Sequence, residues 1–62
     1  MITLQDINTI IMRASYPASK EDLIAFVRRE GYPEEVARRL EVIPEHEYGS
    51  ADTVMDALRG LD

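Results

Sequence analysis

The stretch that decides the fold is YPASKEDLIAFVRREG, residues 16–31. Ser19 is a preferred N-cap residue, and Asp22 stands three positions later, where a capping box places the side chain that returns a hydrogen bond to the cap. At the far end, Gly31 suits the C′ position of a Schellman ending, because glycine adopts the left-handed conformation at no steric cost. Start and stop signals at this spacing predict a helix over residues 20–30.

Apolar residues elsewhere also recur with helical spacing, and no stretch alternates with a period of two for long enough to predict a strand. Tyr16-Pro17 is expected to end the first helix, because the residue before a proline is pushed out of the helical region. Pro33 suits the first position of the third helix, and Ser50 suits the N-cap of the last. The predicted helices cover residues 4–14, 20–30, 33–42 and 51–59. The side chains expected to face the core are Leu4, Ile7, Ile11, Ala14, Leu23, Phe26, Val27, Val36, Leu40, Ile43, Val54, Leu58 and Leu61.

The chain has 62 residues, a formal net charge of −5 and 45% apolar residues. A chain this short forms one domain at most and buries about 60% of the surface that its unfolded form exposes. No segment approaches the roughly 20 consecutive apolar residues of a membrane span, and the first residues lack the basic region of a signal peptide. We therefore expect an all-α fold, a single compact domain over residues 1–62 whose four short helices pack at steep angles, in a small cytoplasmic protein of bacterial type.

Residues suited to catalysis or metal binding are sparse. There is no Cys, and the single histidine, His46, lies between Glu45 and Glu47 in a predicted loop. One histidine cannot build a zinc site without several carboxylates, and neighbours in sequence do not form a catalytic triad. The three glycines stand at caps and turns and form no phosphate-binding loop. We expect no enzymatic activity, no cofactor, no metal site and no small-molecule substrate.

The three tyrosines stand at positions 16, 32 and 48, each directly before Pro or Gly and close to a predicted helix start. A tyrosine at a helix junction buries its ring in the corner and leaves its hydroxyl to water or a nearby carbonyl. The alternative is a surface on which the tyrosines recognise a ligand. We favour the structural interpretation.

Two arginine pairs, Arg28-Arg29 and Arg38-Arg39, lie toward the ends of the second and third helices. If these helices pack antiparallel, the pairs form a basic stripe beside Tyr32, which suits a phosphate or a stacked base. Glutamates are interleaved with these arginines, however, and each arginine of the second pair follows a glutamate by four residues, the favourable order for an ion pair within a helix. A self-paired, solvated face is therefore our first interpretation, and contact with nucleic acid is the alternative.

Four apolar residues lie off the core faces of their helices. On a helical wheel Met12 lies nearly opposite the core face, and the other three are displaced from theirs by about 100° or more. Two of the four are methionines, which suit adaptable contact surfaces. We predict that a protein partner, or a second copy of the chain, binds a surface made of Met12, Ile24, Val42 and Met55.

The segment Tyr16-Pro17-Ala18-Ser19-Lys20-Glu21-Asp22-Leu23 resembles a motif of small bacterial proteins grouped as domain of unknown function 2795. In that family, a Tyr-Pro-Ala-Ser/Thr-Lys-x-Glu/Asp-Leu segment precedes a helix ending in Gly. A helix ending in Leu-Pro follows, then an acidic turn with an aromatic residue, then a last helix opening with Ser. The matching features here are Gly31, Ile43-Pro44, the turn from Glu45 to Tyr48, and Ser50-Ala51-Asp52.

The resemblance spans the chain from Leu4 to Leu58. The chain departs from the family pattern at two places: Tyr32-Pro33 stands where a small residue and an acid are usual, and Ile43 stands where the family usually has Leu. It implies a compact helical fold and no assigned activity. Two roles stay open for the motif: specification of the fold by a turn, a cap and a first-turn lysine, or a binding site. The residues of this corner are Tyr16, Pro17, Ser19 and Lys20.

Taken together, the sequence predicts a non-catalytic protein-interaction module that binds a partner protein or associates with itself. The alternative is a nucleic-acid-associated helical domain, because short capped helices joined by tight turns also describe helix-turn-helix folds. The residues that would contact nucleic acid are Arg28, Arg29, Arg38 and Arg39.

Overall fold

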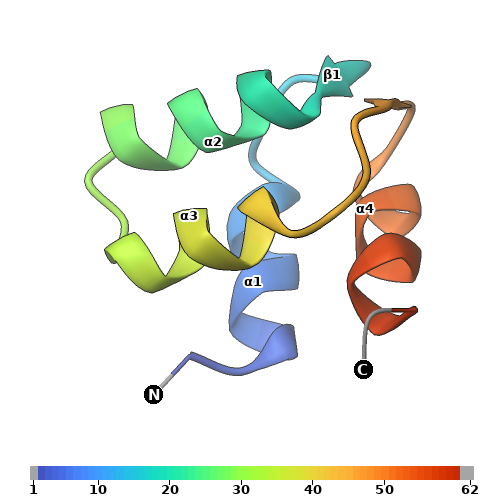
Figure 1. Ribbon diagram of the computed structural model, residues 1–62. Coiled ribbons are helices and arrows are strands. Elements are labelled where there is room, and N and C mark those ends of the chain that lie inside the picture. The colour runs from blue at the N-terminus through green and yellow to red at the C-terminus, as the bar shows by residue number, and fades with distance from the viewer. Residues whose placement is uncertain (1, 61–62) are drawn as a thin grey trace.

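Four helices and two very short strands make up the computed structural model, which describes residues 2–60. In chain order the elements are α1 (Leu4–Ile11), β1 (Ala18–Ser19), α2 (Lys20–Arg29), α3 (Glu34–Glu41), β2 (Glu47–Tyr48) and α4 (Ala51–Arg59). Figure 1 shows α2 and α3 side by side, with α1 and α4 running in another direction. The prediction of four short helices is confirmed, and their steep packing stays a prediction.

The expectation of a purely helical fold is wrong, because β1 and β2 form a small antiparallel sheet. Ala18 stands opposite Tyr48, and Ser19 stands opposite Glu47. Two residues per strand are too few to produce the alternating pattern that reveals a strand in sequence. The sheet joins the start of α2 to the connection that precedes α4, so it links the two halves of the chain.

The signals that define α2 act as predicted. The Ser19 hydroxyl accepts a hydrogen bond from the Asp22 N–H, and the Asp22 carboxylate accepts one from the Ser19 N–H, both at 3.1 Å. At the other end, Gly31 has a φ of +81°, and the Tyr32 N–H donates to the Val27 carbonyl at 3.0 Å. That bond, together with the one from the Gly31 N–H to the Arg28 carbonyl, makes the predicted Schellman ending.

Two predicted helix boundaries are wrong. Helix α1 ends at Ile11, well before Tyr16-Pro17, because the chain tightens into turns: the N–H groups of Arg13 and Ala14 bond three residues back. Pro33 is the N-cap of α3, which begins at Glu34, and it has the extended ψ of 145° that suits a position outside the helix. At α4 the prediction is confirmed, because the Thr53 N–H donates to the Ser50 hydroxyl.

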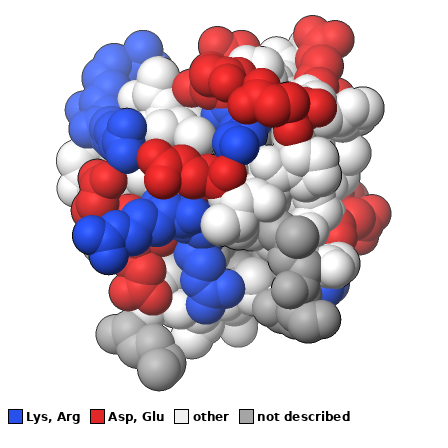
Figure 2. All heavy atoms as spheres, in the orientation of Figure 1, with Lys and Arg blue, Asp and Glu red and all other residues white. Residues whose placement is uncertain are grey.

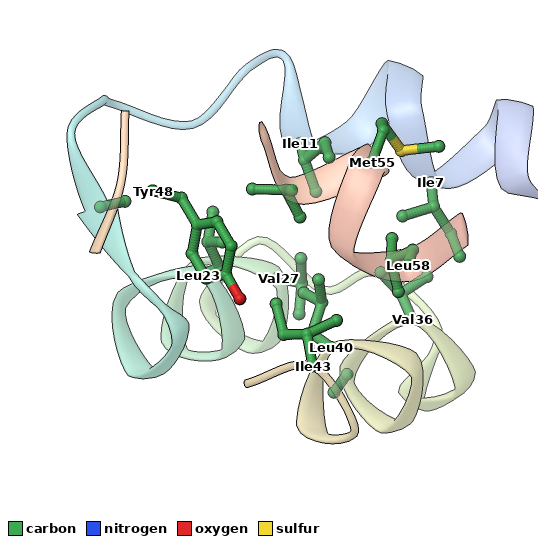
Figure 3. Close-up of a cluster of buried hydrophobic side chains, with 13 residues drawn as sticks. Ile7, Ile11, Leu23, Val27, Val36, Leu40, Ile43, Tyr48, Met55 and Leu58 are labelled. Atoms are coloured by element: carbon green, nitrogen blue, oxygen red, sulfur yellow. The ribbon is translucent and has the colours of Figure 1, made fainter. Parts of the chain in front are cut away.

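A single apolar core lies where the four helices and the sheet meet (Figure 3). Most predicted core residues are buried in it, while Leu4, Ala14 and Phe26 are half-buried at its margin, and Leu61 lies outside the described residues. No polar or charged residue among those described is buried. In residues 2–60, no helix is long and apolar enough to cross a membrane. The buried side chains are Ile7, Ile11, Ala18, Leu23, Val27, Val36, Ala37, Leu40, Ile43, Tyr48, Val54, Met55 and Leu58.

Candidate functional site

The Tyr16–Lys20 corner connects α1 to α2 and is tied to the rest of the fold at three points. The Tyr16 hydroxyl donates to the Ile11 carbonyl at 2.7 Å. Ser19 caps α2 and also pairs with β2. The Lys20 Nζ lies 3.6 Å from a carboxylate oxygen of Glu45, and only 17% of the lysine side chain is exposed. These contacts support a structural role for Tyr16, Ser19 and Lys20, while binding at the corner stays a prediction.

The tyrosines follow the structural interpretation at two of their three positions. Tyr16 and Tyr48 each donate their hydroxyl to a backbone carbonyl at 2.7 Å, that of Ile11 and that of Pro44. Burial raises the pKa of both phenols above the ordinary value near 10, and the Glu45 carboxylate adds to the effect at Tyr48. Tyr32 differs, because its hydroxyl lies 3.5 Å from the Arg13 guanidinium.

The arginine stripe is neutralised mainly at Arg28, and its ion pairs are not the ones predicted. Arg28 lies 2.8 Å from Glu34 and 3.2 Å from Glu41, so one guanidinium on α2 joins both ends of α3. This contact lowers the pKa of Glu34 and raises that of Arg28. Figure 2 shows basic and acidic side chains alternating over the side of the molecule formed by α2 and α3. The four arginines therefore do not form an uninterrupted basic surface.

The remaining arginines separate in space. Arg29 lies 3.8 Å from the neighbouring Glu30 and lines a cavity together with Arg13. Neither Arg38 nor Arg39 makes an ion pair within 4.0 Å inside the described part of the chain. The predicted pairing of the second arginine pair with glutamates four residues earlier is therefore wrong, since Glu34 is instead held by Arg28.

The predicted four-residue partner surface is not formed. The prediction that Met55 belongs to an exposed surface is wrong, because only 3% of the residue is exposed and its side chain points toward α1 in Figure 3. Ile24 is half-buried against the core. Met12 and Val42 are exposed to 64% and 61%, and they are the two large exposed apolar residues in residues 2–60. A helical wheel compares a residue only with its own helix, whereas α4 packs against both α1 and β2, which widens its buried face.

Met12 lines an open groove that the sequence does not reveal. The groove has a volume of about 500 Å³ and runs between the end of α1 and the start of α4. Tyr16 lines it from the corner, and Asn8 lines it from α1. The opposite wall is the segment Gly49–Asp52. We call this feature the Met12 groove.

No signal in the sequence joins Met12 to the Gly49–Asp52 segment, because they are far apart in the chain and meet only through the packing of α1 against α4. The exposure of Met12 is the one property of the groove that helical periodicity predicts. Tyr16 entered the sequence analysis through its motif, and its position beside Met12 comes from the structure. Within residues 2–60, no group of three or more His, Asp or Glu side chains is placed to hold a metal ion.

One protein family matches nearly the whole chain. The model described as "Protein of unknown function (DUF2795)" matches residues 2–55 of the 62. The chain belongs to the DUF2795 family. Comparison with curated proteins and with solved structures finds no significant match.

The DUF2795 match includes every residue that lines the Met12 groove, as well as the Tyr16–Lys20 corner and the α2–α3 ion pairs. It confirms the family that the Tyr16–Leu23 motif suggests. The departures from the family pattern have structural positions here: Pro33 is the N-cap of α3, and Ile43 is buried in the core. Membership of the DUF2795 family implies no activity, so the surface features of this chain are the guide to its function.

Proposed function

We propose that this chain is a non-catalytic protein-binding module whose contact surface is the Met12 groove. One observation carries the proposal: a methionine that is 64% exposed lines an open groove of about 500 Å³, which the half-buried Tyr16 also lines. Methionine has a flexible, polarisable side chain that repacks against differently shaped partners. An open groove lined by such a residue suits an apolar side chain of a partner.

The charge around the groove supports a partner rather than a second copy. The charged residue that lines the groove is Asp52, and the whole chain carries a net charge of −5. Two copies that approach through this acidic side repel each other, whereas a partner with basic residues around its apolar anchor is attracted. The proposed partner is therefore a protein segment that presents one apolar side chain flanked by Lys or Arg.

The nucleic-acid alternative has weaker support. Arg28 is engaged by Glu34 and Glu41, which leaves fewer free cations on the α2–α3 face. Binding to a phosphate backbone depends on clustered cations that displace counterions, and this chain is acidic overall. A cytoplasmic location stays a prediction.

The test compares two substitutions of matched residues. Met12→Glu and Val42→Glu each place a charge on an exposed apolar residue at the C-cap of a short helix, and only Met12 lines the groove. Tagged wild-type chain and both variants are used to co-purify proteins from the organism that encodes the chain, and the captured proteins are quantified by mass spectrometry. We expect a set of proteins that is lost with Met12→Glu, kept with Val42→Glu and released by salt.

Three results would contradict the proposal: no captured protein, equal capture by all three chains, or loss with Val42→Glu alone. Sedimentation velocity of the wild-type chain at the same concentrations distinguishes self-association. A dimer that Met12→Glu dissociates would replace the partner with a second copy and overturn the charge argument.

A further inference from the structure

A second cavity, independent of the Met12 groove, lies between α2 and the segment that precedes it. One face of α2 contributes Asp22, Ala25, Phe26 and Arg29, which are spaced i, i+3, i+4 and i+7, and the segment from Arg13 to Ala18 forms the other wall. The volume is about 330 Å³. This lies within the range of about 300–1,000 Å³ that small-ligand pockets occupy.

The two arginines at this cavity come from different elements, and both have charge to offer. Arg13 follows α1 and makes no ion pair within 4.0 Å in residues 2–60; its one polar side-chain contact there is the Tyr32 hydroxyl at 3.5 Å. Arg29 ends α2 and has only the long contact of 3.8 Å to its neighbour Glu30. Arg28, which lies outside the cavity, has the short ion pairs. Both arginines that line the cavity therefore have a guanidinium that a ligand can engage.

The lining also includes apolar side chains. The half-buried Phe26 and Ala14, and the exposed Pro17 and Ala25, provide apolar surface next to the arginines, whereas Leu23 and Ala18 are buried. The only acid is Asp22, whose carboxylate accepts a hydrogen bond from the Ser19 N–H and is thereby committed to the helix cap. The lining therefore carries a net charge of +1, from two Arg and one Asp, in a chain whose total is −5.

We propose that this Arg13/Arg29 cavity binds a small amphiphile that has one oxyanion group, a carboxylate or a phosphate, on an apolar body about the size of one ring. A guanidinium presents parallel N–H donors that match either oxyanion, and two of them on opposite walls hold it from both sides. The apolar body then lies against Phe26 and Pro17. The ligand is a small anion because two arginines are too few to hold a nucleic-acid backbone.

The experiment follows backbone amide shifts of the ¹⁵N-labelled chain by NMR during titration with three probes: phenylacetate, phenyl phosphate and inorganic phosphate. We expect saturable shifts at residues around the cavity with at least one of the aryl probes, with a Kd on the order of millimolar for ligands of this size. The head group that binds more tightly identifies the oxyanion. Inorganic phosphate is expected to bind at least about tenfold more weakly, because it leaves the apolar surface uncovered.

Three variants make the result specific. Arg13→Gln and Arg29→Gln each remove one cation and are expected to weaken binding roughly tenfold, the usual effect of losing a charged hydrogen bond. Arg38→Gln removes the same charge from α3, outside the cavity, and is expected to change the Kd less than twofold, since it alters only the long-range field. Ala25→Leu fills the exposed side of the cavity without changing its charge and is expected to abolish binding of the aryl probes.

Several outcomes overturn the proposal. Absence of saturable shifts with both aryl probes removes the site. Equal binding of inorganic phosphate and phenyl phosphate shows an adventitious ion only. Equal weakening by Arg38→Gln and Arg13→Gln shows a general charge effect. The dispersion of the amide spectrum confirms that each variant is folded, so that a loss of binding is not a loss of structure.

Discussion

At the scale of single residues, Tyr16 takes part in two features of the molecule. Its hydroxyl satisfies the carbonyl of Ile11, the last residue of α1, while the same side chain lines the Met12 groove. This carbonyl also accepts a hydrogen bond from the Ala14 N–H at 3.1 Å, so the Tyr16 hydroxyl, at 2.7 Å, is its second donor. Tyr48 repeats the arrangement with the Pro44 carbonyl at the second strand.

Removing the Tyr16 hydroxyl tests this role. Tyr16→Phe keeps the ring and deletes one hydrogen bond, so we expect a loss of about 1 kcal/mol in the free energy of unfolding. In a domain of this size that lowers Tm by roughly 4–8 °C, measurable by circular dichroism. Tyr32→Phe is the matched control, because its hydroxyl has only the long contact of 3.5 Å, and we expect a smaller change. An unchanged Tm for Tyr16→Phe would show that the hydroxyl bond contributes nothing.

The buried tyrosines also predict how stability depends on alkaline pH. The folded-state pKa of Tyr16 and Tyr48 lies above the unfolded value near 10, so the contribution of both to stability is fully present below pH 10 and is lost as pH rises through the folded pKa. Urea denaturation at pH values on either side of 10 measures this loss. It should be smaller in the Tyr16→Phe, Tyr48→Phe double variant, and an equal loss in that variant would contradict the assignment.

At the scale of elements, the best-predicted helix is the one with the most explicit ends. Capping box, dipole-favoured charges and Schellman glycine all act within α2 itself, so local sequence was sufficient to define it. The boundaries of α1 and the presence of β1 and β2 depend on other parts of the chain. Tyr16 reaches back to α1, and Ala18 pairs with Tyr48 across the fold. Neither contact leaves a local pattern, which is why periodicity missed both.

Two glycines provide a matched test of the end of α2. Gly31 has a φ of +81°, and no atom lies within 4 Å of the position that the Cβ of an alanine would occupy. The destabilisation expected for Gly31→Ala is therefore purely conformational, about 1–2 kcal/mol. Gly49 has equally open space without a left-handed φ, and Gly49→Ala is expected to change stability by at most a few tenths of a kcal/mol, or to raise it slightly. Thermal unfolding of both variants compares them directly. Equal destabilisation would contradict the assigned C′ role of Gly31.

At the scale of the whole molecule, the surface divides into three regions of different character. The α2–α3 face is bridged by the ion pairs of Arg28, the Arg13/Arg29 cavity is locally cationic, and the Met12 groove borders an acidic segment. The sequence predicted the exposure of Met12, whereas the ion pairs that it predicted for Arg38 and Arg39 are replaced by those of Arg28 with Glu34 and Glu41. It missed both cavities, because each is formed by segments whose approach is set by the packing of whole elements.

The central claim is that a partner protein contacts the Met12 groove, and photo-crosslinking inside living cells tests it most directly. A photoreactive amino acid is placed at position 12 or at position 42, two sites of similar exposure of which only the first lines the groove. We predict that light produces a discrete higher-mass adduct from position 12 and none from position 42, and that the adduct contains a second protein. No adduct from position 12, or the same adduct from both positions, would contradict the claim.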